Sequence, residues 1–244
     1  MTGQDIKNGR SDAAQDFGCE CCINHGRCGL LNIGCGLADD FGLSIRVEEF
    51  CADTQIPTPE SCLLVVKAGA IKTICVDTRG RARVIGFSFP GDLIGLEVLA
   101  GFDHSCVDYK ASVPMTSVCS TKIHPASANR VSPHFGQRLS SELATRIRAN
   151  YRDQQIVKEA AQVRLAHYLT QVIRAGQGRG GSHAATLPNI SRSDIASYLH
   201  LRVETVSRTL ATFRKSGWVR GPLHCLEVVD VDALTLLTRG LATT

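Results

Sequence analysis

The sequence predicts an α+β protein with a strand-rich N-terminal half, a long helix near its middle and a C-terminal winged helix-turn-helix domain. Three observations support this class. Short apolar runs interrupted by glycine and proline fill residues 43–122, which is typical of antiparallel strands. Apolar residues recur at helical spacing between residues 132 and 155. Residues 190–219 have the pattern of two short amphipathic helices joined by a tight turn.

Composition indicates a globular chain with two domains. The chain has 244 residues, of which 43% are hydrophobic, enough to build one or two cores. The net charge of +4 is unevenly distributed, because residues 156–244 hold 11 Lys or Arg against 6 Asp or Glu, while residues 1–155 hold 16 against 17. The basic excess therefore lies in the C-terminal part, where it suits contact with phosphate groups.

Neither a membrane span nor a secretion signal is expected. The sequence has no run of about 18 apolar residues, and its N-terminus is polar, so we expect a cytoplasmic protein. Eleven cysteines are many for that compartment, where disulfides are reduced, and an odd number cannot all pair. Metal binding or redox chemistry is therefore expected for some of these thiols.

A glycine-rich segment near the N-terminus carries four of the cysteines. Cys19, Cys22 and Cys28 have the spacing C-x2-C-x5-C, which lets three thiolates face one small metal centre. Cys21 offers a competing frame, C-x6-C with Cys28. The residues alone leave open an iron–sulfur cluster, a structural zinc site or thiols that bind nothing.

The strand-rich region follows. Its runs are LLVVKAGAIKTICV, RVIGFSFPGDLIG and YKASVPMTSVCST, with a TRG turn between the first two. The earlier segment FCADTQIPTPES gives no clear strand pattern. Most of the cysteines outside the N-terminal segment lie among apolar or strand-like neighbours and are expected to be small buried hydrophobic residues. They are Cys35, Cys51, Cys62, Cys75, Cys106 and Cys225.

Ser132 followed by Pro133 predicts the start of a helix that continues to about Gln155. Its apolar stripe consists of Phe135, Leu139, Leu143 and Ile147. Polar residues replace this stripe beyond Ile147, and four arginines are expected to face or flank the same side. They are Arg138, Arg146, Arg148 and Arg152. A further amphipathic helix is expected from Ile156 to Ala175, at the start of the second domain.

The helix pair at residues 190–219 has the geometry of a DNA-reading unit. Ser191 and Asp194 form a capping-box start for its first helix. The expected buried stripe of the second helix is Val203, Val206, Leu210 and Phe213. The polar row on the opposite face is Glu204, Ser207 and Arg208. An amphipathic helix with such a row near its N-terminus fits the major groove of DNA.

The residues around this unit complete a winged helix. A glycine-rich loop, GQGRGGSH, and a short strand, AATLPNI, precede it. After it, WVRGPLHCLEVVD predicts a β-hairpin with a Gly-Pro turn, and VDALTLLTR predicts a closing helix.

The stretch DIASYLHLRVETVSRTLATFRKSGWV resembles the DNA-binding signature of the CRP/FNR transcription regulators over about thirty residues. The resemblance implies a homodimeric, non-enzymatic regulator with a β-roll sensor domain like that of cyclic-nucleotide-binding proteins, in which VVKAGAIK and FPGDLIG occupy expected places. It also implies the domains: a cysteine-rich segment at 1–36, a β-roll at 37–131, a dimerisation helix at 132–155 and a winged helix at 156–244. DNA and RNA polymerase are the implied partners.

The resemblance also implies roles for the recognition residues. Glu204, Ser207 and Arg208 occupy the base-reading positions, and Val203 replaces an arginine of the cyclic-AMP receptor branch, which favours the FNR branch and its TTGAT half-site. The remaining expected DNA contacts are Val203, Thr205, Arg202, Arg214 and Lys215. Two residues depart from the pattern. His200 replaces the usual turn glycine, and Arg202 replaces a Ser or Thr cap, which should cost about 1 kcal/mol.

In the FNR branch, the same cysteine spacing binds an oxygen-labile [4Fe-4S] cluster. The resemblance implies Cys19, Cys22 and Cys28 as ligands, with Cys119 on the last sensor strand as the fourth. The implied dimer contacts are Phe135, Leu139, Leu143 and Ile147. Cyclic nucleotide binding is not expected, because GFDHSCVDYKA lacks the arginine that would hold a phosphate and contains Asp103 and Asp108.

Two alternatives remain open. The same fold could respond to nitric oxide, to haem or to thiol redox state. A small iron–sulfur electron-transfer protein is the alternative from another class, and the helix-turn-helix argues against it, because an electron carrier needs no base-reading face.

Overall fold

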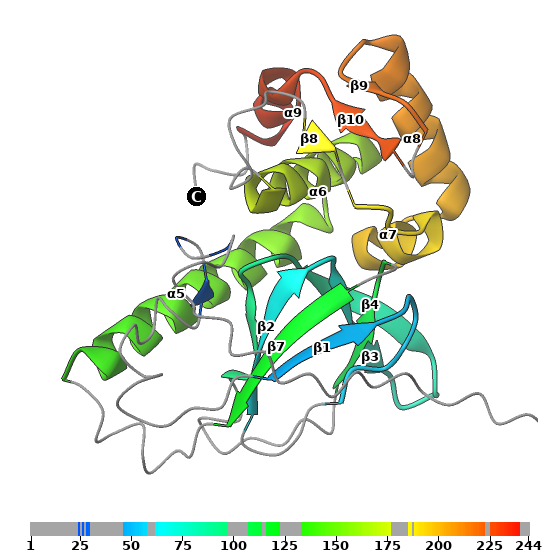
Figure 1. The fold of residues 1–244 in the computed structure, drawn as a ribbon. Coiled ribbons are helices and arrows are strands. Elements are labelled where there is room, and N and C mark those ends of the chain that lie inside the picture. The colour runs from blue at the N-terminus through cyan, green and yellow to red at the C-terminus, as the bar shows by residue number, and fades with distance from the viewer. Residues whose placement is uncertain are drawn as a thin grey trace, which may run out of the picture.

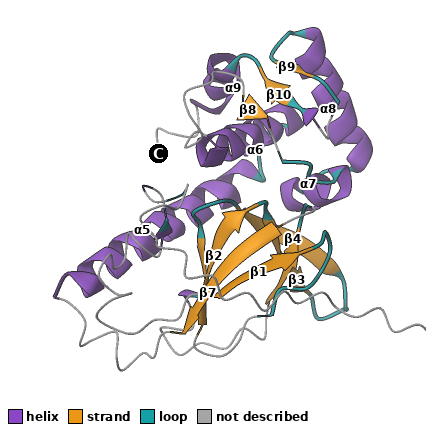
Figure 2. Cartoon of the chain, in the orientation of Figure 1, coloured by secondary structure: helices purple, strands orange, loops and turns teal. Residues whose placement is uncertain are grey.

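The chain folds into two strand layers, a long helix beside them and a mainly helical C-terminal domain, which confirms the predicted α+β class (Figures 1 and 2). The computed structural model describes residues 24, 26, 28–29, 46–57, 62–96, 107–113, 116–122, 133–176, 185–186, 188–222 and 225–239. Among the helices in these ranges, none is both long enough and apolar enough to cross a bilayer.

The N-terminal strands form two antiparallel sheets. They are β1 (Arg46–Phe50), β2 (Cys62–Ala68), β3 (Ile71–Val76), β4 (Ala82–Ser88), β5 (Leu93–Ile94), β6 (Val107–Ala111) and β7 (Thr116–Lys122). One sheet has the order β1-β7-β2-β5 and the other β4-β3-β6. Buried residues of both sheets, including Val66, Val118, Ile71 and Ala111, share one cluster, so the sheets face each other across a core. The three strand-rich runs are confirmed as strands.

Two helices follow, and their boundary differs from the expected one. Helix α5 spans Pro133–Ile156 and α6 spans Ala161–Gly176. Ile156 therefore ends the long helix rather than beginning the next one. A turn separates them, in which the Lys158 amide donates to the Gln155 carbonyl (3.1 Å). The expected cap Ser132 lies outside the described residues.

Helix α6 supplies the centre of the C-terminal core through Leu165, Leu169 and Ile173, which are at most 1% exposed. The remaining elements are β8 (Ala185–Thr186), α7 (Arg192–Leu199), α8 (Val203–Lys215), β9 (Val219–Arg220), β10 (Glu227–Val228) and α9 (Val231–Thr238). Strands β8, β10 and β9 form one small sheet, and the expected wing and closing helix are confirmed. Gly221 turns the wing with φ 81°, and a Cβ there would lie 2.5 Å from the Cys225 carbonyl oxygen, so only glycine fits.

Candidate DNA-reading helix and thiol site

The first helix of the recognition unit begins and ends as the sequence predicts, with one difference. The Ser191 hydroxyl accepts from the Asp194 amide (3.0 Å), and His200 ends α7 in the left-handed conformation at φ 55°. In a full capping box the Asp194 carboxylate would accept from the Ser191 amide. Here it instead accepts from Lys72 Nζ at 2.9 Å, on the sensor sheet.

The second helix packs through one face. Val206, Leu210 and Phe213 are at most 1% exposed, and each stabilises the fold by about 1.5–3 kcal/mol through burial. Val203 is 40% exposed, so its expected place in the buried stripe is wrong: it is the first residue of α8, and the buried part of the helix begins at Val206. Arg202 precedes the helix without a side-chain cap bond, which confirms the missing cap.

The opposite face of α8 is open. Glu204 and Arg208 are exposed and Ser207 is partly exposed. Within the described part of the chain, no carboxylate lies within ion-pairing distance of Arg208. The guanidinium is therefore available to an external acceptor such as a guanine edge.

Four further candidate DNA contacts differ in exposure. Arg202 and Lys215 are exposed, and Thr205 is partly exposed. Arg214 is also partly exposed, and its Nε donates to the Gly221 carbonyl (2.9 Å). Arg214 thus joins the end of α8 to the wing, a role that the sequence did not indicate.

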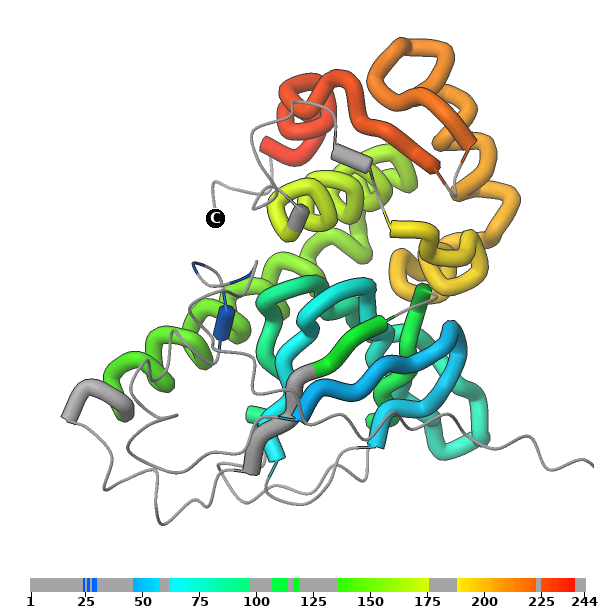
Figure 3. The backbone as a smooth tube through the Cα atoms, in the orientation of Figure 1, coloured from blue at the N-terminus to red at the C-terminus, as the bar shows by residue number. Residues whose placement is uncertain are grey.

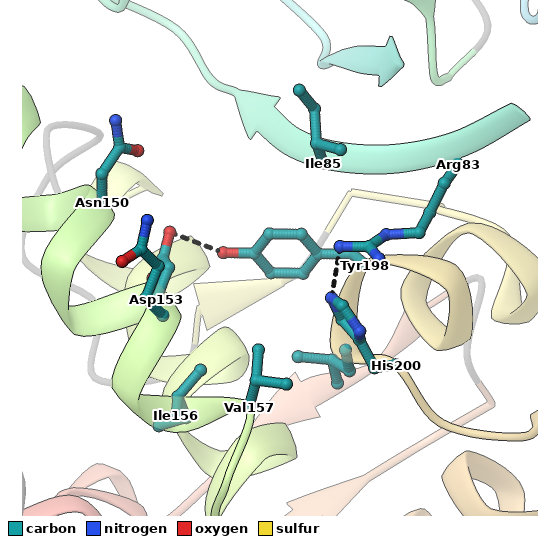
Figure 4. A pocket seen from close by; sticks show the side chains of 10 residues that line it. Arg83, Ile85, Asn150, Asp153, Ile156, Val157, Tyr198 and His200 are labelled. Atoms are coloured by element: carbon teal, nitrogen blue, oxygen red, sulfur yellow. Dashed lines mark hydrogen bonds between the residues drawn. The ribbon is translucent and has the colours of Figure 1, made fainter. Parts of the chain in front are cut away.

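A cavity of about 390 Å³ lies where β4, α5 and the α7–α8 turn meet (Figure 4). Inside it Arg83 Nη2 lies against His200 Nε2, and the Tyr198 hydroxyl donates to Asp153 Oδ2 at 3.1 Å. Burial lowers the pKa of His200, and the nearby Arg83 and Arg164 lower it further. A neutral His200 ring can accept the hydrogen bond from Arg83.

We expect acid to weaken the fold through His200. Its pKa in the folded state is below its unfolded value of about 6.5, so the unfolded chain binds more protons and the free energy of unfolding falls as pH drops below 6.5. Thermal melts of the wild type and of His200→Asn between pH 7.5 and 5 measure this, since asparagine also tolerates positive φ. The melting temperature of the variant should fall less than that of the wild type as the pH drops. The same fall in both proteins would contradict this role of His200.

The described part of the thiol segment docks on the sensor sheet. Cys28 is 9% exposed, and the Gly29 amide donates to the Gly91 carbonyl (2.8 Å). A Cβ on Gly29 would lie 2.8 Å from Leu93 Cβ, so the close approach requires glycine. Asn24 Nδ2 donates to the Lys67 carbonyl (2.7 Å), which holds the segment at a second point.

The backbone register relates this docking point to Cys119. Leu93 of β5 pairs with Val65 of β2, and Val65 pairs with Cys119 of β7. The three residues form one row across the sheet, and two strand spacings separate its ends by about 10 Å. Cys19, Cys22 and the Cys119 side chain lie outside what the structure describes.

The other described cysteines do not share one environment. Cys62 is buried and Cys75 is partly exposed. Cys51 and Cys225 are exposed, so the expectation of small buried residues is wrong for these two, which lie in a turn and in the wing. Cys35 and Cys106 lie outside the described residues.

The outer face of α5 is apolar and open. Leu143 is 40% and Ile147 50% exposed, while Leu139 is partly exposed. Tyr151, four residues after Ile147 and 63% exposed, extends the stripe beyond the point where the sequence interpretation ended it. The i+4 spacing is the signal that was missed. The side chain of Phe135 is not among the described ones.

Arg146 does not face outward as expected. Its Nη2 donates to the Leu93 carbonyl on β5, and its Nε lies 3.4 Å from Glu142 Oε1. The same short segment, Gly91–Leu93, therefore contacts both Gly29 and helix α5.

Comparison with known proteins gives a consistent result. Residues 163–237 match the family model of the Crp-like helix-turn-helix domain. The chain is 29% identical over 185 residues to the transcriptional activator protein anr of Pseudomonas aeruginosa, covering 72% of this chain and 73% of that protein. It is 27% identical over 188 residues to the fumarate and nitrate reduction regulatory protein of Escherichia coli, covering 74% and 73%.

Solved structures show the same fold. The structure of FixK2 from Bradyrhizobium japonicum matches with a TM-score of 0.64 and 22% identity, covering 80% of this chain and 96% of that one. A CRP/FNR family transcriptional regulator from Thermus thermophilus matches with a TM-score of 0.60 and 18% identity, covering 79% and 98%.

Proposed function

Because this chain belongs to the CRP/FNR family of transcription regulators and is FNR-like, we propose that it is an oxygen-responsive regulator of genes for low-oxygen metabolism. Like its relatives, it is a DNA-binding protein, and it is not an enzyme. The observation that carries the proposal is the docking of Gly29, next to the buried Cys28, against the strand segment that α5 also contacts. Its DNA target implies that it works in the cytoplasm.

The proposed cofactor is a [4Fe-4S] cluster held by Cys19, Cys22, Cys28 and Cys119. Thiolates are the ligands that such clusters take. Two features fit the proposal: Cys28 is shielded from solvent, and Cys119 lies in the row of residues that starts at the docking point of Gly29. When bound, the cluster would supply a centre that oxygen degrades, while the residues around Gly29 hold the segment on the sheet.

The proposed route from the thiols to the DNA runs through helix α5. The exposed apolar stripe Leu143, Ile147 and Tyr151, with Leu139, would pair with its twin in a homodimer. Arg146 Nη2 and the Leu93 carbonyl join this helix to the segment that receives Gly29. Loss of the cluster would release the thiol segment, and the contact at Leu93 would pass the change to α5.

The proposed operator is an inverted repeat of TTGAT-type half-sites, read in the major groove by Glu204, Ser207 and Arg208. Arg202 and Lys215 would mainly contact phosphates. Recruitment of RNA polymerase would make the protein an activator, as the Pseudomonas relative is named. Cyclic nucleotide is not proposed as a ligand.

Arg208→Ala should weaken binding to the inverted repeat by about 1–3 kcal/mol, because a bidentate contact to guanine is lost. Its exposed guanidinium has no carboxylate partner within the described chain, so the substitution should not disturb the fold. Titration of wild type and variant, without air, on TTGAT repeats and on scrambled DNA measures the effect. Equal losses on both DNAs would show that Arg208 contacts only phosphate.

Iron and acid-labile sulfide content per chain, measured without air, tests the cofactor directly. The proposal expects about four of each per chain, together with a visible absorption that air bleaches. A haem spectrum, zinc in place of iron, or thiols without metal would replace the cluster with one of the other signals. Iron–sulfur content without sequence-specific DNA binding would favour an electron-transfer protein.

A further inference from the structure

A buried lysine connects the sensor sheet to the recognition unit. Lys72 Nζ on β3 lies 2.6 Å from Asp53 Oδ1 and 2.9 Å from Asp194 Oδ2, and its side chain is only 8% exposed. Asp194 belongs to α7 and is 17% exposed, whereas Asp53 is 77% exposed. Lysine is almost never buried without a partner, and removing one partner of a buried pair is costly. The pair therefore fixes α7 on the sensor sheet.

The partners of Lys72 favour its charged form. Burial alone would lower the pKa of Lys72, but the hydrogen bonds and charges of Asp53 and Asp194 outweigh it, so the pKa is raised. Lys72 is therefore positively charged at neutral pH, as an ion pair with Asp53 and Asp194 requires.

Two further contacts continue along α7. The Val84 amide of β4 donates to the Ser197 hydroxyl (3.0 Å), and Arg83 lies against His200 at the end of α7. Strand β4 is at the edge of its sheet, so Ser197 satisfies an amide that no strand pairs with on that side. Helix α7 therefore contacts the sheet through Asp194, Ser197 and its C-cap residue His200. Figure 3 shows α7 lying next to the sensor strands.

The same helix is also fixed to α5. The Tyr198 hydroxyl donates to Asp153 Oδ2, and the Tyr198 ring packs on Phe87 of β4 at 5.4 Å between centroids. Because α8 packs against α7, the direction of the reading helix relative to α5 follows from these contacts. Glu204 and Arg208 remain exposed in this arrangement, so it presents the reading face rather than covering it.

The use of Asp194 supports a positioning role over local stability. In a capping box its carboxylate would stabilise the start of α7, yet it reaches across the chain to Lys72, 122 residues away. A local stabilising bond is replaced by one between domains.

We propose that Lys72 is a positioning residue for DNA recognition, which sets the direction of α8 through Asp194 so that two recognition helices of a dimer match half-sites at one spacing. The inference rests on the proposed function for its dimer and its inverted repeat. It concerns the spacing of the two reading helices, not the bases that each one reads.

The first test needs no DNA. Hydrogen exchange on the wild type, on Lys72→Met and on Lys110→Met compares the amide of Val84 with the rest of the β3–β4 pairing. Lys110 is the matched control because it lies opposite Lys72 in the β3–β6 pairing. Lys72→Met should speed exchange at Val84 by about tenfold or more while the other β4 amides keep their protection. Unchanged exchange at Val84 would show that Lys72 does not hold α7 on the sensor sheet and would overturn the proposal.

The second test uses DNA and air-free protein. An operator is first selected by the wild type from random inverted repeats, so that failure of the TTGAT assignment does not affect the result. Lys72→Met should bind this operator about tenfold more weakly, bind a single half-site almost as well as the wild type, and discriminate less against a one-base-pair change in spacing. Equal loss on the operator and the single half-site would show that Lys72 only stabilises the fold and would overturn the positioning role.

Asp194→Asn provides a second variant, because asparagine keeps the hydrogen-bonding oxygen but removes the charge. It should change Val84 exchange and spacing preference in the same direction as Lys72→Met, by a smaller factor. The double variant should be no worse than Lys72→Met alone, since both substitutions remove one interaction. If the affinity losses of the two single variants add in the double variant, Lys72 and Asp194 do not act through one interaction. This comparison holds even if either single variant is less stable than the wild type.

Discussion

Cys119→Ser is expected to make the air-free protein monomeric and to abolish its iron–sulfur absorption. Serine is a poor substitute for a cluster thiolate, and without the cluster the thiol segment loses its tie to β7. The dimer face of α5 is modest, with Leu143 and Ile147 only half exposed and polar residues between them. A bias of a few kcal/mol then moves most of the population between dimer and monomer. Sedimentation without air measures the change.

The matched control is Cys225→Ser. Cys225 is exposed in the wing, far along the chain from the thiol segment, and its replacement should leave both the cluster and the dimer intact. Wild type that has been exposed to air should behave like Cys119→Ser. A dimer of unchanged affinity after complete loss of iron would end the proposed coupling and leave the thiol segment as a structural site.

Local rules were enough to predict the recognition unit. The Ser191 cap, the left-handed His200 and the missing cap at Arg202 each depend on a few neighbouring residues, and each is observed. The error at Val203 has the same local origin. Helical spacing assigns a residue to a face, but it does not show that burial of that face begins only at Val206.

Contacts between domains could not be predicted in this way. Nothing near Lys72 in the sequence indicates that its partner is Asp194, and Arg146 has a local partner in Glu142 that hides its contact with the Leu93 carbonyl. Such pairs depend on how the sheets and helices pack, and a single sequence carries no record of that. The proposed coupling of the thiol segment, the sheet and α5 is supported by two such contacts, Gly29 with Gly91 and Arg146 with Leu93.

Inserting half a turn of DNA, about five base pairs, between the two half-sites should abolish tight binding. The recognition helices of a symmetric dimer must lie about 34 Å apart on one side of the duplex, and the insertion turns one half-site to the other side. Helix α7 is fixed to the sensor sheet and to α5, so α8 is not free to follow that rotation. Only one half-site can then be read.

Affinity should fall by at least about a hundredfold, toward the value for an isolated half-site, because half of the specific contacts are lost. In the matched control, the base pairs between the two half-sites are changed in sequence but not in number. The spacing is then kept, and binding should be preserved. Titrations are made without air at one salt concentration, since salt changes the phosphate contribution. If the wild type binds the lengthened operator as tightly as the original, its recognition helices do not act as a rigid symmetric pair.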